Sequence, residues 1–149
     1  MKKYLLLIPV FLLLLTGCGS SGKKTVCTLT RDVDGVKISV EYTLNHDDKY
    51  ISNVVFDETY EASDKDTADY YENYVKELYE GAKEKYGGYE VDIQRDNLTV
   101  KALVKINYEK VDMTKLLADT PELSSFVEEN KMLYDKMTSY YNLAGLSCK

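Results

Sequence analysis

The sequence contains no tryptophan, one histidine, two prolines and three cysteines among its 149 residues. A serine or cysteine nucleophile needs a base within reach, and His46 is the sole imidazole in the chain. It lies in the polar segment Asn45–Asp48, which predicts a surface turn, and no serine accompanies it in a nucleophile motif. One histidine and two cysteines also lack the local spacing of a zinc site. The sequence therefore indicates no catalytic triad and no metal centre.

Basic residues are in the minority and do not gather into patches. The chain has 19 basic and 25 acidic residues, a formal net charge of −6. Without residues 1–17, which hold two lysines and no acid, 17 basic residues face 25 acidic ones, a net charge of −8. The phosphates of a nucleic acid repel a domain of this charge. We therefore expect no nucleic acid among its partners.

The longest hydrophobic run is short and lies at the N-terminus. Tyr4–Leu15 spans twelve residues, whereas a transmembrane helix needs about 20. Lys2 and Lys3 precede the run, as in a secretory signal. The run ends in Leu15-Thr16-Gly17-Cys18, which resembles the bacterial lipobox. The resemblance implies that Cys18 receives a diacylglycerol and that the chain is cleaved after Gly17.

This segment predicts how the chain is organised. Residues 1–17 are expected to be a lipoprotein signal peptide, residues 18–25 a lipidated cysteine with a flexible tether, and residues 26–149 one domain. Two acyl chains, of the palmitate type, anchor a protein stably where one chain is marginal. We expect the protein at the cell membrane, on its extracytoplasmic face. The lipid is the only group we expect it to carry, without a cofactor.

The two remaining cysteines, Cys27 and Cys148, lie near opposite ends of the predicted domain. Thiols outside the cytoplasm are commonly oxidised, so a single disulfide between the two is the favoured interpretation. Closing so long a loop stabilises a fold by roughly 4–5 kcal/mol on the chain-entropy model. The alternative is a redox pair, but the CxxC spacing of such pairs is missing.

Alternation of apolar and polar residues predicts strands, and helical spacing predicts helices. The predicted strands cover residues 25–33, 36–44, 50–59, 89–94 and 98–108, and the predicted helices cover residues 63–86, 112–118 and a longer stretch from Pro121 to near Gly145. Tight turns join most strands, and each strand has one apolar face. We expect an α+β fold with a single antiparallel sheet of about five strands, in β-β-β-α-β-β-α order, with helices packed on one face.

Acidic residues are abundant enough to form pairs by chance. Thirteen of the 25 lie between Asp57 and Asp96, largely along the predicted helix. A solvated helix face explains them, and an envelope hydrolase with paired carboxylates is the alternative. The segment Asp64-Lys65-Asp66 begins like a calcium loop, but the later ligand positions do not match.

Tyrosine is the one residue type in excess, with fourteen copies. Tyr70, Tyr71, Tyr74 and Tyr79 gather on the predicted first helix and form a candidate contact surface. Tyrosine combines a large apolar ring with a polar tip, which suits a surface that binds an envelope protein, a peptide or a glycan. The alternative is that these rings pack at the edge of the core.

Several features together resemble the YehR-like family of small bacterial lipoproteins. They are the lipobox, the turn Asp34-Gly35-Val36-Lys37 and the segment 106–116, which reads Ile-Asn-Tyr-Glu-Lys-Val-Asp-Met-Thr-Lys-Leu. The resemblance covers about residues 1–118 and implies a lipid anchor and the fold, but no catalytic residue. The expected function is a non-enzymatic binding or accessory module of the cell envelope. An envelope hydrolase and a purely structural lipoprotein are the alternatives.

Overall fold

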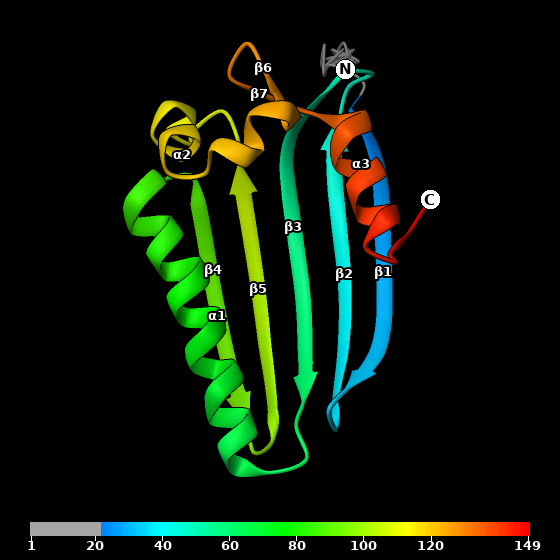
Figure 1. Cartoon of the computed structure of the whole chain (residues 1–149), viewed down its shortest axis with the longest axis vertical. Coiled ribbons are helices and arrows are strands. Elements are labelled where there is room, and N and C mark those ends of the chain that lie inside the picture. The colour runs from blue at the N-terminus through cyan, green and yellow to red at the C-terminus, as the bar shows by residue number, and fades with distance from the viewer. Residues whose placement is uncertain (1–21) are drawn as a thin grey trace, which may run out of the picture.

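The computed structural model describes residues 22–149, so Cys18 and the predicted signal segment lie outside the described residues. One antiparallel sheet forms one layer, and helices cover part of a single face of it (Figure 1). We call the end of the sheet where Lys23 enters, together with His46 and Tyr50, the tether end. Within residues 22–149 no helix is long and apolar enough to cross a membrane.

Five long strands carry the sheet, and three short ones complete it. They are β1 (Lys23–Val33), β2 (Val36–His46), β3 (Tyr50–Glu61), β4 (Tyr89–Asp96), β5 (Thr99–Asn107), β6 (Val127–Glu128), β7 (Lys131–Leu133) and β8 (Ser147–Cys148). Their order across the sheet is β4-β5-β3-β2-β1-β8, with β7 paired to β3 and β6 to β7. The α+β prediction is confirmed, but the sheet has eight strands rather than about five. Strands of two or three residues are too short to show alternation in a sequence.

Four helical segments accompany the sheet: α1 (Lys65–Tyr86), α2 (Met113–Asp119), the 3-10 helix η1 (Pro121–Phe126) and α3 (Tyr134–Leu143). The Asp64 side chain accepts a hydrogen bond of 2.8 Å from the backbone N–H of Thr67 and so caps the start of α1. Gly87 and Gly88 end the helix with φ values of +66° and +75°, which only glycine adopts without strain.

The prediction of one long helix from Pro121 to near Gly145 is wrong. The segment forms η1, the hairpin β6–β7 and then the ten-residue α3. At the hairpin turn Glu129 and Asn130 have φ values of +52° and +60°, which a continuous right-handed helix excludes. Pairing of β7 with Tyr50 and Ile51 of β3 holds the hairpin in place, and this tertiary contact overrides the helical spacing.

Side chains on the helix side of the sheet line up in rows across the strands. One such row consists of Leu29, Val40, Glu58, Ala102 and Ile93. The helix α1 runs along β4 and β5, whereas the short α3 lies over β1 and β2 near the tether end (Figure 1). The core is therefore thickest beneath α1 and at the tether end.

Candidate functional site

Glu58 is a buried carboxylate in the middle of the helix side of the sheet. Only 3% of its surface is exposed, and it forms no ion pair among residues 22–149. Three phenol groups donate to it instead: Tyr42 and Tyr79 to Oε1 and Tyr60 to Oε2, each at 2.8 Å. The three rings come from β2, β3 and α1, so the carboxylate joins these elements. We call these four residues the Glu58 cluster.

Burial, followed by the nearby charge of Glu58, raises the pKa of Tyr42, Tyr60 and Tyr79 well above the usual value for tyrosine. The phenols therefore stay neutral as hydrogen-bond donors. A buried carboxylate is stable only when its oxygens are bonded, and the three donors meet that need. The cluster explains why tyrosine is so frequent here: part of the excess forms the polar centre of the core.

The four tyrosines of the predicted contact surface have different surroundings. Tyr70 is 63% exposed and Tyr74 is 47% exposed, and their rings stack with centroids 6.3 Å apart. Tyr71 is half-buried and stacks on Tyr60 with centroids 4.8 Å apart. Tyr79 is only 8% exposed because its hydroxyl points inward to Glu58. Tyr79 therefore belongs to the core and Tyr71 packs at its edge, so the exposed part of the set is Tyr70 and Tyr74.

Between α1 and α3 the helix side of the sheet is incompletely covered (Figure 1). Four apolar side chains there are half-buried: Leu29 on β1, Ile38 and Val40 on β2, and Phe56 on β3. We call them the open strip. A series of ring contacts leads from this region to Tyr74. Tyr60, which is paired with Ile38, stacks on Tyr71; Tyr71 meets Tyr70 edge-on with centroids 5.3 Å apart, and Tyr70 stacks on Tyr74. An apolar strip therefore adjoins an exposed aromatic edge.

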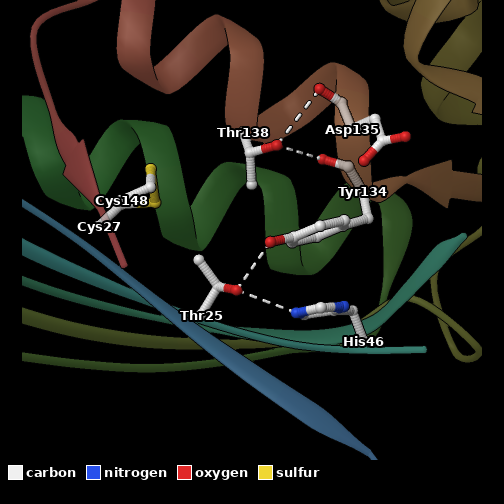
Figure 2. Close-up of a disulfide and its surroundings, with 7 residues drawn as sticks. All are labelled: Thr25, Cys27, His46, Tyr134, Asp135, Thr138 and Cys148. Atoms are coloured by element: carbon white, nitrogen blue, oxygen red, sulfur yellow. Dashed lines mark hydrogen bonds between the residues drawn. A yellow bond between two sulfur atoms is a disulfide. The ribbon is translucent and has the colours of Figure 1, made fainter. Parts of the chain in front are cut away.

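A second buried polar group lies at the tether end and is shown in Figure 2. Tyr134 donates to the Thr25 hydroxyl at 2.8 Å, and that hydroxyl donates to Nε2 of His46 at 3.0 Å. The Nδ1–H of His46 donates to the Asp47 carbonyl oxygen. The His46 and Tyr134 rings stack with centroids 3.6 Å apart. The expectation of a surface turn is wrong for His46: it ends β2, is 5% exposed and ties β1 and β2 to α3.

The disulfide lies beside this network, on the same face of the sheet (Figure 2). Cys27 of β1 and Cys148 of β8 are bonded, as the sequence predicts, across 121 residues of chain. They are also directly paired in the β1–β8 ladder. The bond therefore attaches the C-terminal strand to the edge of the sheet.

A cavity of about 600 Å³ opens at the tether end. Its floor includes the buried Ile51, Val111 and Met113, and its rim carries several carboxylates and Lys131. Two of these carboxylates have structural roles. Asp47 accepts the backbone N–H groups of Lys49 and Tyr50, which lowers the pKa of Asp47, and Asp112 caps α2.

Several of the acidic side chains on α1 form ion pairs with neighbouring basic residues. Arg95 of β4 lies 3.1 Å from both Asp69 and Glu72, and Lys76 pairs with Glu72 at 2.6 Å. The pKa of Asp69 is lowered first by its hydrogen bond from Lys65 and then by Arg95, and the pKa of Glu72 is lowered first by Lys76. No group of three or more histidine, cysteine, aspartate or glutamate side chains in residues 22–149 is arranged to hold a metal ion.

Glu58 is the site residue that the sequence analysis did not single out. A signal was present, because alternation along β3 places Glu58 on the same face as Val54, Phe56 and Tyr60. A lone acid on an apolar face needs hydrogen-bond donors. Which tyrosines supply them depends on how α1 packs against the sheet, and that is a tertiary feature.

Two solved structures resemble this one. The NMR structure of the Escherichia coli YehR protein is 15% identical with a TM-score of 0.58, and the match covers 86% of this chain and 92% of that one. The NMR structure of a protein from Streptococcus pneumoniae TIGR4 is 14% identical with a TM-score of 0.53, covering 100% of this chain and 98% of that one. At such low identity these likenesses show the fold alone, and they extend past the residues 1–118 of the sequence resemblance.

No curated protein matches the sequence. A family model does match it, over residues 19–149, and is described as a domain of unknown function, DUF8824. The match spans the predicted tether and the whole described domain, including the C-terminal hairpin, α3 and β8. The chain therefore belongs to the DUF8824 family.

Proposed function

We propose that this protein is a lipid-anchored binding module of the bacterial cell envelope, akin to the YehR-like lipoproteins. The N-terminal Leu15-Thr16-Gly17-Cys18 motif supports a diacylglycerol anchor on the extracytoplasmic face of the membrane. The module has no catalytic role and binds an envelope protein, a peptide or a glycan.

The observation that carries this proposal is the open strip beside the exposed tyrosines. Leu29, Ile38, Val40 and Phe56 are half-buried in the free domain, and Tyr70 and Tyr74 stand exposed at the α1 side. A contiguous apolar surface with an aromatic edge is typical of an interaction site. A partner that covers the strip removes this surface from water, which favours association.

The hydrolase alternative receives less support. A general acid of a glycosidase needs a raised pKa. Where the pKa of a carboxyl group departs clearly from its usual value, it is lowered, as for Asp47, Asp69, Glu72 and Glu128. Glu58, the one buried carboxylate in residues 22–149, has both oxygens occupied by phenols.

Site-specific photo-crosslinking on living cells tests the proposal. A photoreactive amino acid replaces Tyr74 in one variant and Leu103 in the control. Leu103 is 37% exposed on the opposite face of the sheet, where neither α1 nor α3 lies. We expect crosslinked species at position 74 that are absent at position 103 and are reproducible in mass spectrometry. Equal capture at both positions, or none at 74, would contradict the proposal.

A further inference from the structure

One edge of the sheet is only partly paired. β8 covers β1 at Cys27 and Thr28, and Lys149 continues the pairing to Val26 through two backbone hydrogen bonds of 2.9 Å. Beyond Thr28 the outer edge of β1 has no partner strand within residues 22–149. Figure 1 shows β1 running on past the C-terminal segment at the rim of the sheet. The free edge consists of residues 29–33.

Alternation fixes which backbone groups this edge presents. Val26 bonds outward to Lys149, so the even-numbered residues of β1 direct their N–H and C=O groups away from β2. Thr30 and Asp32 therefore hold two N–H and two C=O groups at the free edge. Such a row of unpaired groups is a template for another strand.

The side chains on the helix side of the free edge indicate what that strand carries. Leu29, Arg31 and Val33 alternate there, and Leu29 joins the open strip through its pairing with Val40. Arg31 is exposed and forms no ion pair among residues 22–149. It is one of only two arginines in a chain with a net charge of −6.

From these features we propose that the free edge of β1 binds an extended segment of a different polypeptide, as an added antiparallel strand in line with β8. Backbone hydrogen bonds to Thr30 and Asp32 supply the attachment. The segment places an acidic side chain opposite Arg31, between apolar side chains opposite Leu29 and Val33. This inference rests on the proposed function, because it names the kind of partner that the binding module takes.

A second copy of the chain does not fit this edge. Two β1 edges paired around Arg31 would set one arginine directly against the other, in the closely spaced non-hydrogen-bonded position. Pairing around Asp32 would oppose two carboxylates. Pairing around Thr30 would bring Asp32 of one copy against Thr28 of the other, where Ser147 already lies. Repulsion between like charges and the presence of β8 therefore exclude a second copy, so the added strand comes from a different chain.

The test uses a random twelve-residue peptide library displayed on phage, selected against the purified full chain. Affinities of the recovered peptides are then measured for the original chain and for Thr30→Pro, Thr30→Ala and Arg31→Glu. Proline at position 30 removes an N–H that no ladder bond uses, so the fold tolerates it at this edge. Thr30→Ala is the matched control, since it changes the side chain and keeps the N–H.

We expect the recovered peptides to carry one acidic residue with an apolar residue two positions before it and another two positions after it. Thr30→Pro should weaken them at least about tenfold, whereas Thr30→Ala changes affinity by less than about threefold. Arg31→Glu should reverse the preference from an acidic to a basic residue. Recovery of no peptide, or of peptides that bind Thr30→Pro as well as the original chain, would overturn the inference.

A second measurement separates this inference from the proposed function. In hydrogen-exchange NMR, the Thr30 and Asp32 amides should be unprotected in the free chain and become protected when a recovered peptide binds. If crosslinking at position 74 still captures a specific partner while these amides stay unprotected, the binding module stands and the added strand does not.

Discussion

At the scale of single residues, the core is organised around a charge without a counter-charge. Glu58 accepts hydrogen bonds from three phenol groups. Phenylalanine at any of these three positions would keep the ring but lose the donor. A hydrogen bond to a buried charged group contributes more than one between neutral groups, about 1.5–3 kcal/mol. The three phenol hydroxyls therefore stabilise the fold in addition to the rings that carry them.

Replacing Tyr79 by phenylalanine tests this. Tyr79→Phe keeps the ring and removes one donor to Glu58, so the free energy of unfolding should fall by about 1.5–3 kcal/mol. Urea denaturation followed by circular dichroism measures it. Tyr70→Phe is the control, because Tyr70 is exposed and makes no hydrogen bond through its hydroxyl among residues 22–149. A loss for Tyr79→Phe no larger than for the control would rule out the role given to the cluster.

The same hydroxyls predict sensitivity to alkali. The pKa of Tyr42, Tyr60 and Tyr79 is raised in the folded chain, first by burial and then by the charge of Glu58. Above about pH 10 the unfolded chain loses these protons and the folded chain keeps them, so the free energy of unfolding falls as the pH rises. The slope is up to about 1.4 kcal/mol per pH unit for each tyrosine.

Stability should be unaffected by these ionisations below about pH 9. Urea denaturation between about pH 8 and 11 measures the slope, and absorbance at about 295 nm reports tyrosine ionisation. The Tyr79→Phe variant should show a shallower slope. A flat profile up to about pH 11 would show that these phenols ionise as freely when folded as when unfolded.

At the scale of elements, replacing either of two glycines by alanine should change the free energy of unfolding in opposite directions. A Cβ atom on Gly88 would meet the Asn107 carbonyl oxygen at 2.8 Å and the Val111 nitrogen at 2.9 Å, at a φ of +75°. Gly88→Ala should therefore lower the free energy of unfolding by about 2–4 kcal/mol. Gly81 lies inside α1, and a Cβ atom at this position would meet nothing within 4 Å.

Gly81→Ala should raise the free energy of unfolding by about 0.5–1 kcal/mol, since alanine is the better helix former. The two variants change the same atoms and control for each other in thermal or urea denaturation. Equal effects of both substitutions would contradict the packing described around the β4 start and the loop after β5.

The disulfide is expected both to stabilise the whole domain and to hold the C-terminal elements in place. β8 has two residues and is attached to β1 through Cys148, so Cys148→Ser should free β8 and loosen α3. The free energy of unfolding should fall by about 2–5 kcal/mol. Thermal melting with and without reductant measures it, and hydrogen exchange locates it. Protection near β8 and α3 that is no weaker in the variant than in the original chain would contradict this role.

Elements were predictable from the sequence where a long periodic pattern determines them. The strands β1 to β5 and the helix α1 follow from alternation and helical spacing within their own residues. The segments after Pro121 do not, because η1, β6–β7 and β8 owe their form to contacts with β3 and β1. The same division holds for the candidate site. The gathering of tyrosines on α1 was visible in the sequence, but the exposure of Tyr70 and Tyr74 and the inward turn of Tyr79 were not, because they depend on how α1 packs against the sheet.

At the scale of the whole molecule, the proposed lipid anchor on Cys18 would determine the location of the domain. Cys18→Ala should remove the lipid and move the protein from the membrane fraction to the soluble extracytoplasmic fraction. Intact-mass measurement of the membrane form should show a chain that begins at residue 18 and carries a diacylglycerol. A mature chain that begins there without added mass would contradict the anchor.

The path of β1 also has a mechanical consequence. A pull on the chain at residue 22 acts along β1, which pairs with β2 over all eleven of its residues. Force in this direction loads the whole ladder of hydrogen bonds at once instead of opening them one by one. Four residues after Lys23 the load reaches Cys27 and a covalent bond. If the protein is anchored at its N-terminus and pulled by a partner, as we propose, the β1–β2 ladder and the disulfide would resist unfolding from that end.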